Sequence, residues 1–129
     1  MDEQERFNKG MDARRRVLGD AHVDRATARR DELTAEFQDL LTRYAWGEIW
    51  TRPGLDERTR RMLVLAMLVA LGRDAELRMH VAAAFDHGLS PQDVKEVFLQ
   101  TAVYCGLPAA NNAFRIAQDV LAGRGDASD

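Results

Sequence analysis

The hydrophobic positions of this chain recur with the spacing of α-helices and almost nowhere with the alternation of strands. Between Leu33 and Trp46 the apolar residues form one helical stripe: Leu33, Phe37, Leu40, Leu41, Tyr44 and Ala45. A shorter amphipathic stretch covers Met11 to Leu18 and ends at Gly19. The chain has no alternating β-branched run and no Asn-Gly hairpin turn. The pattern therefore predicts an all-α fold.

Turn and cap residues divide the remainder into further helices. Asp56 is a candidate N-cap for a helix that runs to Leu71, and Ser90-Pro91-Gln92-Asp93 is a strong helix start. The other predicted helices cover 74–87, 91 to about 105, and 108 to about 123, with glycine stops at 72, 88 and 106. Gly47 is expected to weaken the end of the 33–46 helix.

We see no repeat, linker or second domain, so we expect a single domain over 1–129 with about six helices. Residues 1–32 form an N-terminal arm, in which His22 stands in a solvated loop. The polar tail 124–129 is expected to fray. The run Met62–Leu71 is apolar all round, which fits either a central helix or burial against a partner subunit.

Composition excludes several classes of protein. The chain has 18 Lys and Arg against 21 Asp and Glu, a net charge of −3, which argues against a nucleic-acid binder. A single Cys excludes a disulfide framework and a zinc site built from cysteines. The longest apolar run is about half of what a bilayer needs, and the N-terminus has no signal-peptide pattern. We therefore expect a cytoplasmic protein with no membrane partner.

His80 is the first candidate for chemistry. Arg73, Glu76 and His80 lie along one helical stripe, so a guanidinium, a carboxylate and an imidazole share a face. One interpretation is a general acid or base His80 oriented by Glu76. The alternative is an ordinary surface pair between Glu76 and His80. His87, seven residues further on, suits a helix C-terminus, and about 10 Å separates it from His80, which is too far for a shared metal. We expect no metal site.

Arg58, Arg60 and Arg61 crowd the first turns of the helix that follows Asp56. Cations are unfavourable at the positive end of a helix, so this cluster indicates an anion site built from guanidinium groups and backbone N–H groups. The alternative is ion pairing with Asp56, Glu57 or a neighbouring helix.

Two other segments carry candidate residues. Trp46-Gly47-Glu48-Ile49-Trp50 places two aromatics around an acid, a pattern more typical of a core or an interface than of a cofactor site. Cys105 has no second Cys with which to form a disulfide, and we expect a buried, inert thiol.

The sequence also resembles the 4-carboxymuconolactone decarboxylases of protocatechuate degradation, nearly from end to end. Three blocks carry most of the likeness: Gly10-Met11-Asp12-Ala13-Arg14-Arg15-Arg16-Val17-Leu18-Gly19-Asp20, Tyr44-Ala45-Trp46-Gly47-Glu48-Ile49-Trp50, and Val103-Tyr104-Cys105-Gly106-Leu107-Pro108-Ala109-Ala110. The wider superfamily includes alkylhydroperoxidases, whose helical fold the resemblance implies here. Those enzymes carry Cys-x-x-Cys-x-x-x-His, whereas Arg73 and Glu76 stand at the two cysteine positions before His80.

The resemblance implies a cofactor-independent decarboxylation of a lactone dicarboxylate, a step of the β-ketoadipate pathway. His80 would be the general acid, with Glu76 orienting it and Glu48 as a further member of the proton relay. Arg58, Arg60 and Arg73 would bind the carboxylates, and Trp46, Trp50 and Tyr104 would wall the pocket. The family implies a homo-oligomer, a hexamer or trimer. The alternatives are a thiol-dependent peroxidase acting through Cys105 and a helical binding protein without catalytic activity.

Overall fold

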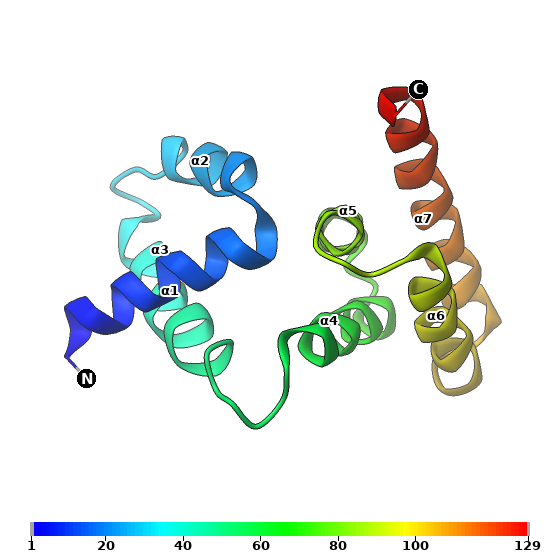
Figure 1. Cartoon of the computed structure of the whole chain (residues 1–129), viewed down its shortest axis with the longest axis horizontal. Coiled ribbons are helices and arrows are strands. Elements are labelled where there is room, and N and C mark those ends of the chain that lie inside the picture. Colours follow the sequence, from blue (N-terminus) through cyan, green and yellow to red (C-terminus); the bar gives the residue numbers. More distant parts are fainter. Residues whose placement is uncertain (1, 129) are drawn as a thin grey trace. The chain divides into compact units, whose positions relative to one another are not determined.

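A computed structural model describes the backbone of residues 2–128 and the side chains of residues 2–124. Met1 and Asp129, the outer ends of the predicted arm and tail, lie outside this part. The described chain contains helices and no strand, which confirms the all-α prediction (Figure 1). Two compact units divide it, an N-terminal unit (Met1–Glu57) and a C-terminal unit (Arg58–Asp129).

The elements follow one another with short connections. The N-terminal unit holds α1 (Glu3–Leu18), α2 (Asp20–Ala28), α3 (Ala35–Leu41) and the π-helix η1 (Thr42–Ile49). The C-terminal unit holds α4 (Glu57–Leu71, whose first residue closes the N-terminal unit), α5 (Asp74–Asp86), α6 (Pro91–Cys105) and α7 (Leu107–Ser128).

The first helix begins eight residues earlier than the predicted start at Met11. Asp2 caps it, since its carboxylate accepts a hydrogen bond from the backbone N–H of Glu5 at 2.8 Å. Glu3 and Glu5 place negative charge in the first turn, where the helix dipole favours it. The apolar pattern missed this turn because charge and capping stabilise it rather than burial.

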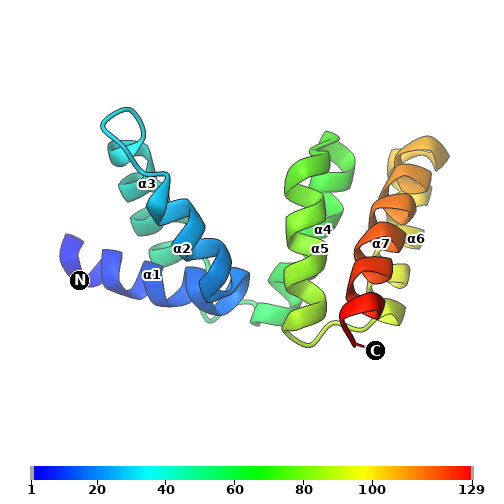
Figure 2. The ribbon, with the colours of Figure 1, turned by 90° about the horizontal axis from the view of Figure 1, so that it is seen from above.

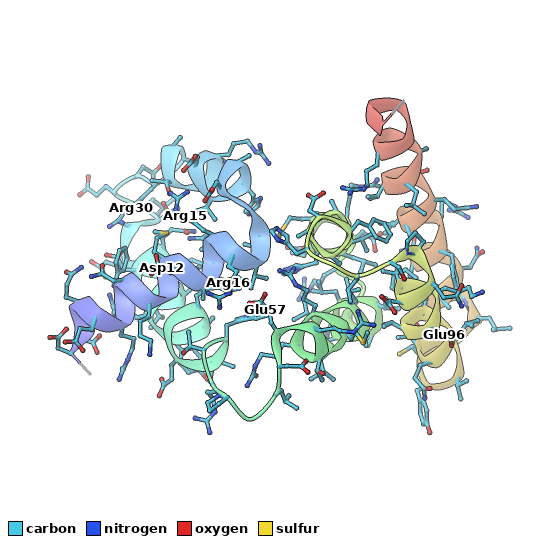
Figure 3. The ribbon with its side chains drawn as sticks, viewed as in Figure 1. Asp12, Arg15, Arg16, Arg30, Glu57 and Glu96 are labelled. Carbon is cyan, nitrogen blue, oxygen red and sulfur yellow. The ribbon has the colours of Figure 1, made fainter. Side chains whose placement is uncertain are left out.

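The prediction of a solvated loop around His22 is wrong. These residues form α2, and His22 is half-buried within it. Val23 is fully buried and anchors the helix. Arg15 reaches from α1 toward α2 and pairs with Asp20 at 3.1 Å and with Asp24 at 2.9 Å (Figure 3). Because one buried Val and two ion pairs hold α2 in place, its sequence shows little of the apolar periodicity that predicts a helix.

The helix predicted from Leu33 to Trp46 is instead a short α3 that continues as an eight-residue π-helix. The helix continues past Gly47 to Ile49, and η1 packs at this glycine directly against the backbone of α1. A Cβ on Gly10 would lie 1.9 Å from the carbonyl oxygen of Thr42, and one on Gly47 would lie 2.3 Å from that of Arg6. Only glycine at both positions allows the two helices to approach so closely.

The C-terminal unit has one hydrophobic core to which all four of its helices contribute. The core residues are Leu65 and Val69 of α4, Leu77, Val81 and Ala84 of α5, Leu89, Val94 and Phe98 at α6, and Ala113, Ile116 and Ala117 of α7. Figure 2 shows α6 and α7 side by side, and the rings of Phe98 and Phe114 pack edge to face across this pair with centroids 5.5 Å apart.

Most predicted boundaries in this unit are confirmed. Ser90 accepts from the N–H of Asp93, and the Asp93 carboxylate accepts from the N–H of Ser90, so the capping box is complete. The glycine stops at positions 72, 88 and 106 all have positive φ, as does Gly19 in the N-terminal unit. Helix α4 begins directly after Asp56, and α7 runs to Ser128 rather than ending near Gly123.

Several apolar side chains face solvent in both units. In the N-terminal unit they include Leu33, Phe37, Leu40 and Tyr44, which belong to the stripe that predicted a helix. In the C-terminal unit they include Leu63, Met67 and Leu71 of α4, and Leu99, Val103, Tyr104 and Leu107 around the α6–α7 corner. Thus Met62–Leu71 buries one side in its own unit and leaves another uncovered. Within the residues the structure covers, no helix is both long and apolar enough to span a bilayer.

Candidate active site

His80 lies in the middle of α5 and is half-buried. The start of this helix is fixed by polar contacts, since Asp74 accepts a hydrogen bond from the side-chain amide of Asn112 in α7 at 2.9 Å. Asp74 and Glu76 also place negative charge at the positive end of the helix. Helix α5 therefore holds His80 on a rigid element that its neighbour α7 braces.

Glu76 and Arg73, the proposed companions of His80, are both exposed. Arg73 occupies the N-cap position of α5, and Glu76 stands one turn before His80. Among the residues described, the structure gives no hydrogen bond between Glu76 and His80. The orienting role of Glu76 therefore stays a prediction.

Arg58 is held by an acid of the neighbouring helix α6. Its two terminal nitrogens donate to the two carboxylate oxygens of Asp93, at 2.7 Å and 3.1 Å. This fork, with the N–H of Ser90, lowers the pKa of the Asp93 carboxyl well below its usual range. The sequence left two interpretations of Arg58 open, an anion site and an ion pair with a neighbouring helix. The structure shows the ion pair.

Arg60 and Arg61 are enclosed more deeply on the same helix. Arg60 is half-buried and Arg61 is almost fully buried. At the first residue of α4, Glu57 pairs with Arg16 of α1 at 2.7 Å. A group that binds a substrate carboxylate must be both partly buried and accessible. Of the arginines that begin α4, Arg60 meets both conditions.

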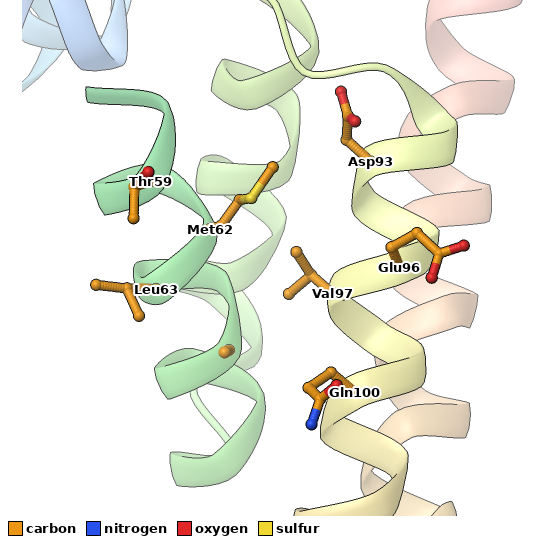
Figure 4. Close-up of a pocket in the computed structure, with 8 residues that line it drawn as sticks. Thr59, Met62, Leu63, Asp93, Glu96, Val97 and Gln100 are labelled. Carbon is orange, nitrogen blue, oxygen red and sulfur yellow. The ribbon is translucent and has the colours of Figure 1, made fainter. Parts of the chain in front are cut away.

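A groove of about 330 Å³ runs between α4 and α6 (Figure 4). Its floor is apolar, with Met62, Leu63, Ala66 and Val97, and Asp93 and Glu96 stand on its α6 side. Neither His80 nor Arg60 lines it. The residues that line it include no Arg, Lys or His, so this groove does not suit a dicarboxylate substrate.

Trp46, Trp50 and Glu48 belong to the π-helix segment of the N-terminal unit. Trp46 is buried and stacks on Trp50 with ring centroids 5.1 Å apart. The pair packs as part of this unit's interior, which agrees with the expectation of a core role. Glu48, between them in sequence, is exposed.

Tyr104 and Cys105 lie at the end of α6. The Tyr104 side chain is 81% exposed. The prediction of a buried Cys105 thiol is wrong, because the residue is exposed at the helix terminus before Gly106. An apolar stretch precedes it, but the helix turns its last residues outward. No group of three or more His, Cys, Asp or Glu residues able to hold a metal ion occurs in the described part of the chain.

Comparison with known proteins gives the family. The model of the carboxymuconolactone decarboxylase family matches residues 35–119, from α3 into α7. The chain belongs to this family. It is accordingly an enzyme of the carboxy-lyase class.

Two curated relatives extend the likeness beyond the family model. A 4-carboxymuconolactone decarboxylase of Acinetobacter baylyi is 41% identical over 121 residues, which cover 94% of this chain and 90% of that protein. Nitrosuccinic acid decarboxylase npaB of Metarhizium robertsii is 34% identical over 115 residues, covering 89% and 80%. The first alignment must include most of the residues before 35, so the sequence likeness extends into the segments that form α1 and α2 here.

Sequence reasoning missed two buried arginines of this carboxymuconolactone decarboxylase family member. Arg61 stood in the predicted anion cluster but received no role, and Arg14 stood within the Arg14-Arg15-Arg16 run of the N-terminal block. Both are more than nine-tenths buried. An Arg run predicts a solvated helix face, and only the packing of α1 shows which of the three guanidiniums is enclosed.

Proposed function

We propose that this enzyme decarboxylates 4-carboxymuconolactone to β-ketoadipate enol-lactone, in the protocatechuate branch of aromatic catabolism. The observation that carries the proposal is the 41% identity to the Acinetobacter baylyi decarboxylase over nearly the whole of both chains. The sequence block from Gly10 to Asp20, which lies outside the family model, supports this substrate rather than the family in general. As part of the same proposal, the enzyme acts in the cytoplasm.

The chemistry needs a proton donor and positive charge, and no resident electron sink. When the ring carboxylate leaves as CO₂, its bonding electron pair moves through the ring double bond to the lactone carbonyl. The resulting enolate then takes a proton at the ring carbon next to that carbonyl. Because the substrate itself stores the electron pair, pyridoxal, thiamine or a metal is not required for the step.

His80 is the proposed donor of that proton. It is half-buried on a braced helix, which keeps an imidazole both oriented and accessible. Glu76 would hold the imidazolium in place, and positive charge near the lactone oxygen would stabilise the enolate. These roles are assigned to residues of the C-terminal unit. Glu48, Trp46 and Trp50 belong to the other unit, and the proposal does not depend on them.

Arg60 and Arg73 are the preferred groups for the substrate carboxylates. Arg58 is the weaker candidate, since a substrate would have to displace Asp93 from its guanidinium fork. The carboxylate that leaves should be held less firmly than the acetate arm, because catalysis requires tighter binding of the transition state than of the substrate.

A second substrate deserves a direct comparison, because one relative is named a nitrosuccinic acid decarboxylase. Nitrosuccinate is also a dicarboxylate with its own electron sink, as the nitro group accepts the electron pair to form a nitronate. Protonation of that anion is the same task that we assign to His80. The shared requirement is therefore a dianion whose decarboxylation leaves a delocalised carbanion.

Purified protein tests the proposal. We expect loss of lactone absorbance with stoichiometric CO₂ release and no added metal or cofactor, and slower turnover of nitrosuccinate. His80→Gln should lower kcat roughly 10²–10⁴-fold with an unchanged fold by circular dichroism. If the enzyme turns over nitrosuccinate but not the lactone, nitrosuccinate is the substrate and the lactone is not. If the His80→Gln variant is fully active, His80 is not the proton donor.

Cys105→Ser separates the decarboxylase from a thiol peroxidase. The exposed thiol at the end of α6 has no partner Cys, so no disulfide can form within one chain. We expect Cys105→Ser to leave lactone turnover intact and the wild-type protein to consume no peroxide. Peroxide consumption that depends on Cys105 would favour the thiol enzyme.

We also propose that the enzyme is a homo-oligomer, a trimer or hexamer. The support is the set of apolar side chains exposed in the N-terminal unit, on α4 and at the α6–α7 corner, because burial against another copy of the chain would stabilise them.

A further inference from the structure

Arg14 is a buried cation whose guanidinium forms no ion pair with the described residues of the N-terminal unit. Its side chain is 8% exposed, and its Nε is buried with no hydrogen-bond partner among the described residues. The two arginines that follow it pair with Asp20, Asp24 and Glu57. Burial lowers the pKa of the Arg14 guanidinium, and no carboxylate acts in the other direction. An enclosed charge of this kind is unfavourable unless something neutralises it.

A hollow of about 30 Å³ lies beside this guanidinium. Its polar lining comes from α1, α2, the α2–α3 connection, α3 and η1, and consists of Arg14, Thr27, Arg30, Gln38, Asp39 and Thr42. A water molecule needs roughly 10–15 Å³ of such space, so there is room for a small ion but not for a large organic acid.

The side chains that line the hollow carry a net charge of one positive unit. Arg30 pairs with Asp39 at 2.8 Å, so these two neutralise each other. Thr42 donates its hydroxyl proton to the carbonyl oxygen of Gln38 at 2.7 Å. The Thr27 hydroxyl, the Gln38 amide and the remaining N–H groups of Arg30 can still donate, and the charge of Arg14 is uncompensated.

His22 on α2 responds to the same charge. Its pKa is lowered, first by burial and then by the positive charges of Arg14 and Arg25. A neutralising ion beside Arg14 would weaken one of these effects, so the titration of His22 provides a local reporter of the hollow.

We propose that the hollow between α1, α2, α3 and η1 binds a small monovalent anion, a chloride ion or the carboxylate group of a formate-sized acid, with Arg14 as its charge partner. Thr27, Arg30 and Gln38 donate to it, and Asp39 restricts the site to one negative charge. Water can fill the space but cannot supply the missing charge. The site is independent of the decarboxylation that we propose, since none of its residues belongs to the proposed catalytic set.

The test measures ³⁵Cl NMR line widths and the pKa of His22, with gluconate as the reference anion at constant ionic strength. Wild-type protein should broaden the chloride line saturably, and chloride should raise the pKa of His22. In Arg14→Met both responses should disappear, and the pKa of His22 should already be raised. Arg25→Gln is the matched control, because it removes the other cation near His22 but should keep both responses.

Formate identifies the class of anion. Displacement of chloride by formate, with the same rise in the pKa of His22, shows that a carboxylate group enters the site, and the absence of displacement restricts it to the halide. Should Arg14→Met fail to fold, bromide can be added to the wild-type protein in chloride. If bromide narrows the broadened ³⁵Cl line, it displaces chloride from a saturable site, and no variant is needed. Broadening that does not saturate, or that Arg14→Met retains, overturns the proposal.

Discussion

At the scale of single residues, the ion pair between Arg58 and Asp93 predicts how stability depends on pH. The folded protein lowers the pKa of Asp93, through Arg58 first and the N–H of Ser90 second. A lowered pKa contributes stability above the ordinary value near 3.8, and that contribution is lost as pH falls toward the folded pKa. Asp93→Asn should therefore lower Tm at pH 7, and its difference from wild type should shrink below about pH 4.

Glu96→Gln provides the control for this prediction. Glu96 is exposed on the same helix, one turn after Asp93, and forms no ion pair with Arg58. Its replacement should change Tm little and without the same pH dependence. Equal pH profiles for the two variants would contradict the role of the Arg58–Asp93 pair.

Arg60 is the residue on which substrate affinity should depend most. A planar guanidinium binds a carboxylate with two parallel hydrogen bonds, which an ammonium group cannot reproduce. We expect Arg60→Lys to raise KM roughly 10-fold or more while kcat and Tm change less. Arg58→Lys should do the opposite, lowering Tm with a smaller effect on KM, because Asp93 engages its fork. Steady-state kinetics and thermal melts of the two variants separate substrate binding from structural pairing.

At this scale, the sequence predicts a feature when the residues that determine it lie close together in the chain. The capping box at Ser90 was predictable because Ser90 and Asp93 satisfy each other within one turn. The burial of Arg14 was not, because an Arg run looks the same whether or not another helix covers one of its members. Cys105 shows the reverse error, since the apolar residues before it indicated burial and the helix end exposes it.

At the scale of elements, the contact between α1 and η1 depends on two glycines. Because a Cβ at Gly10 would lie 1.9 Å from the Thr42 carbonyl oxygen, Gly10→Ala must push the helices apart. We expect it to reduce the free energy of unfolding by about 2–3 kcal/mol, measured by urea denaturation. Gly123→Ala in α7, where a Cβ meets nothing within 4 Å, should be neutral or stabilising by up to about 1 kcal/mol. A fully stable Gly10→Ala would contradict the close packing of this pair.

Like α2, the π-helix is an element that no pattern predicted. Its backbone hydrogen bonds skip one more residue than those of an α-helix, as in the bond from Trp50 N–H to the Ala45 carbonyl at 3.0 Å. The stacking of Trp46 on Trp50 is local to this segment, whereas the contact of Gly47 with α1 forms only in the folded unit. The apolar stripe from Leu33 to Tyr44 correctly indicated a helix, whereas its winding depends on long-range packing.

At the scale of the whole molecule, helical periodicity and glycine stops were enough for the all-α fold, and residue blocks were enough for the family. The same apolar stripes that predicted helices did not predict which helices would be covered. Leu33 and Phe37 belong to such a stripe and are exposed, as is Met67 of α4. A pattern shows that a face is apolar, but not whether its partner is in the same chain.

These uncovered faces predict self-association of the enzyme. Met67 is 53% exposed in the middle of α4, with Leu63 and Leu71 one turn to either side along the helix. An exposed stripe of this kind is stabilised by burial against another copy, so native mass measurement should give a multiple of 14.5 kDa. Met67→Glu should dissociate the assembly at micromolar concentration, since it would bury a charge without a partner. Gln118→Glu adds the same charge at an exposed position on α7 and should leave the assembly intact. A wild-type mass of 14.5 kDa at all concentrations would show instead that these apolar faces remain in water.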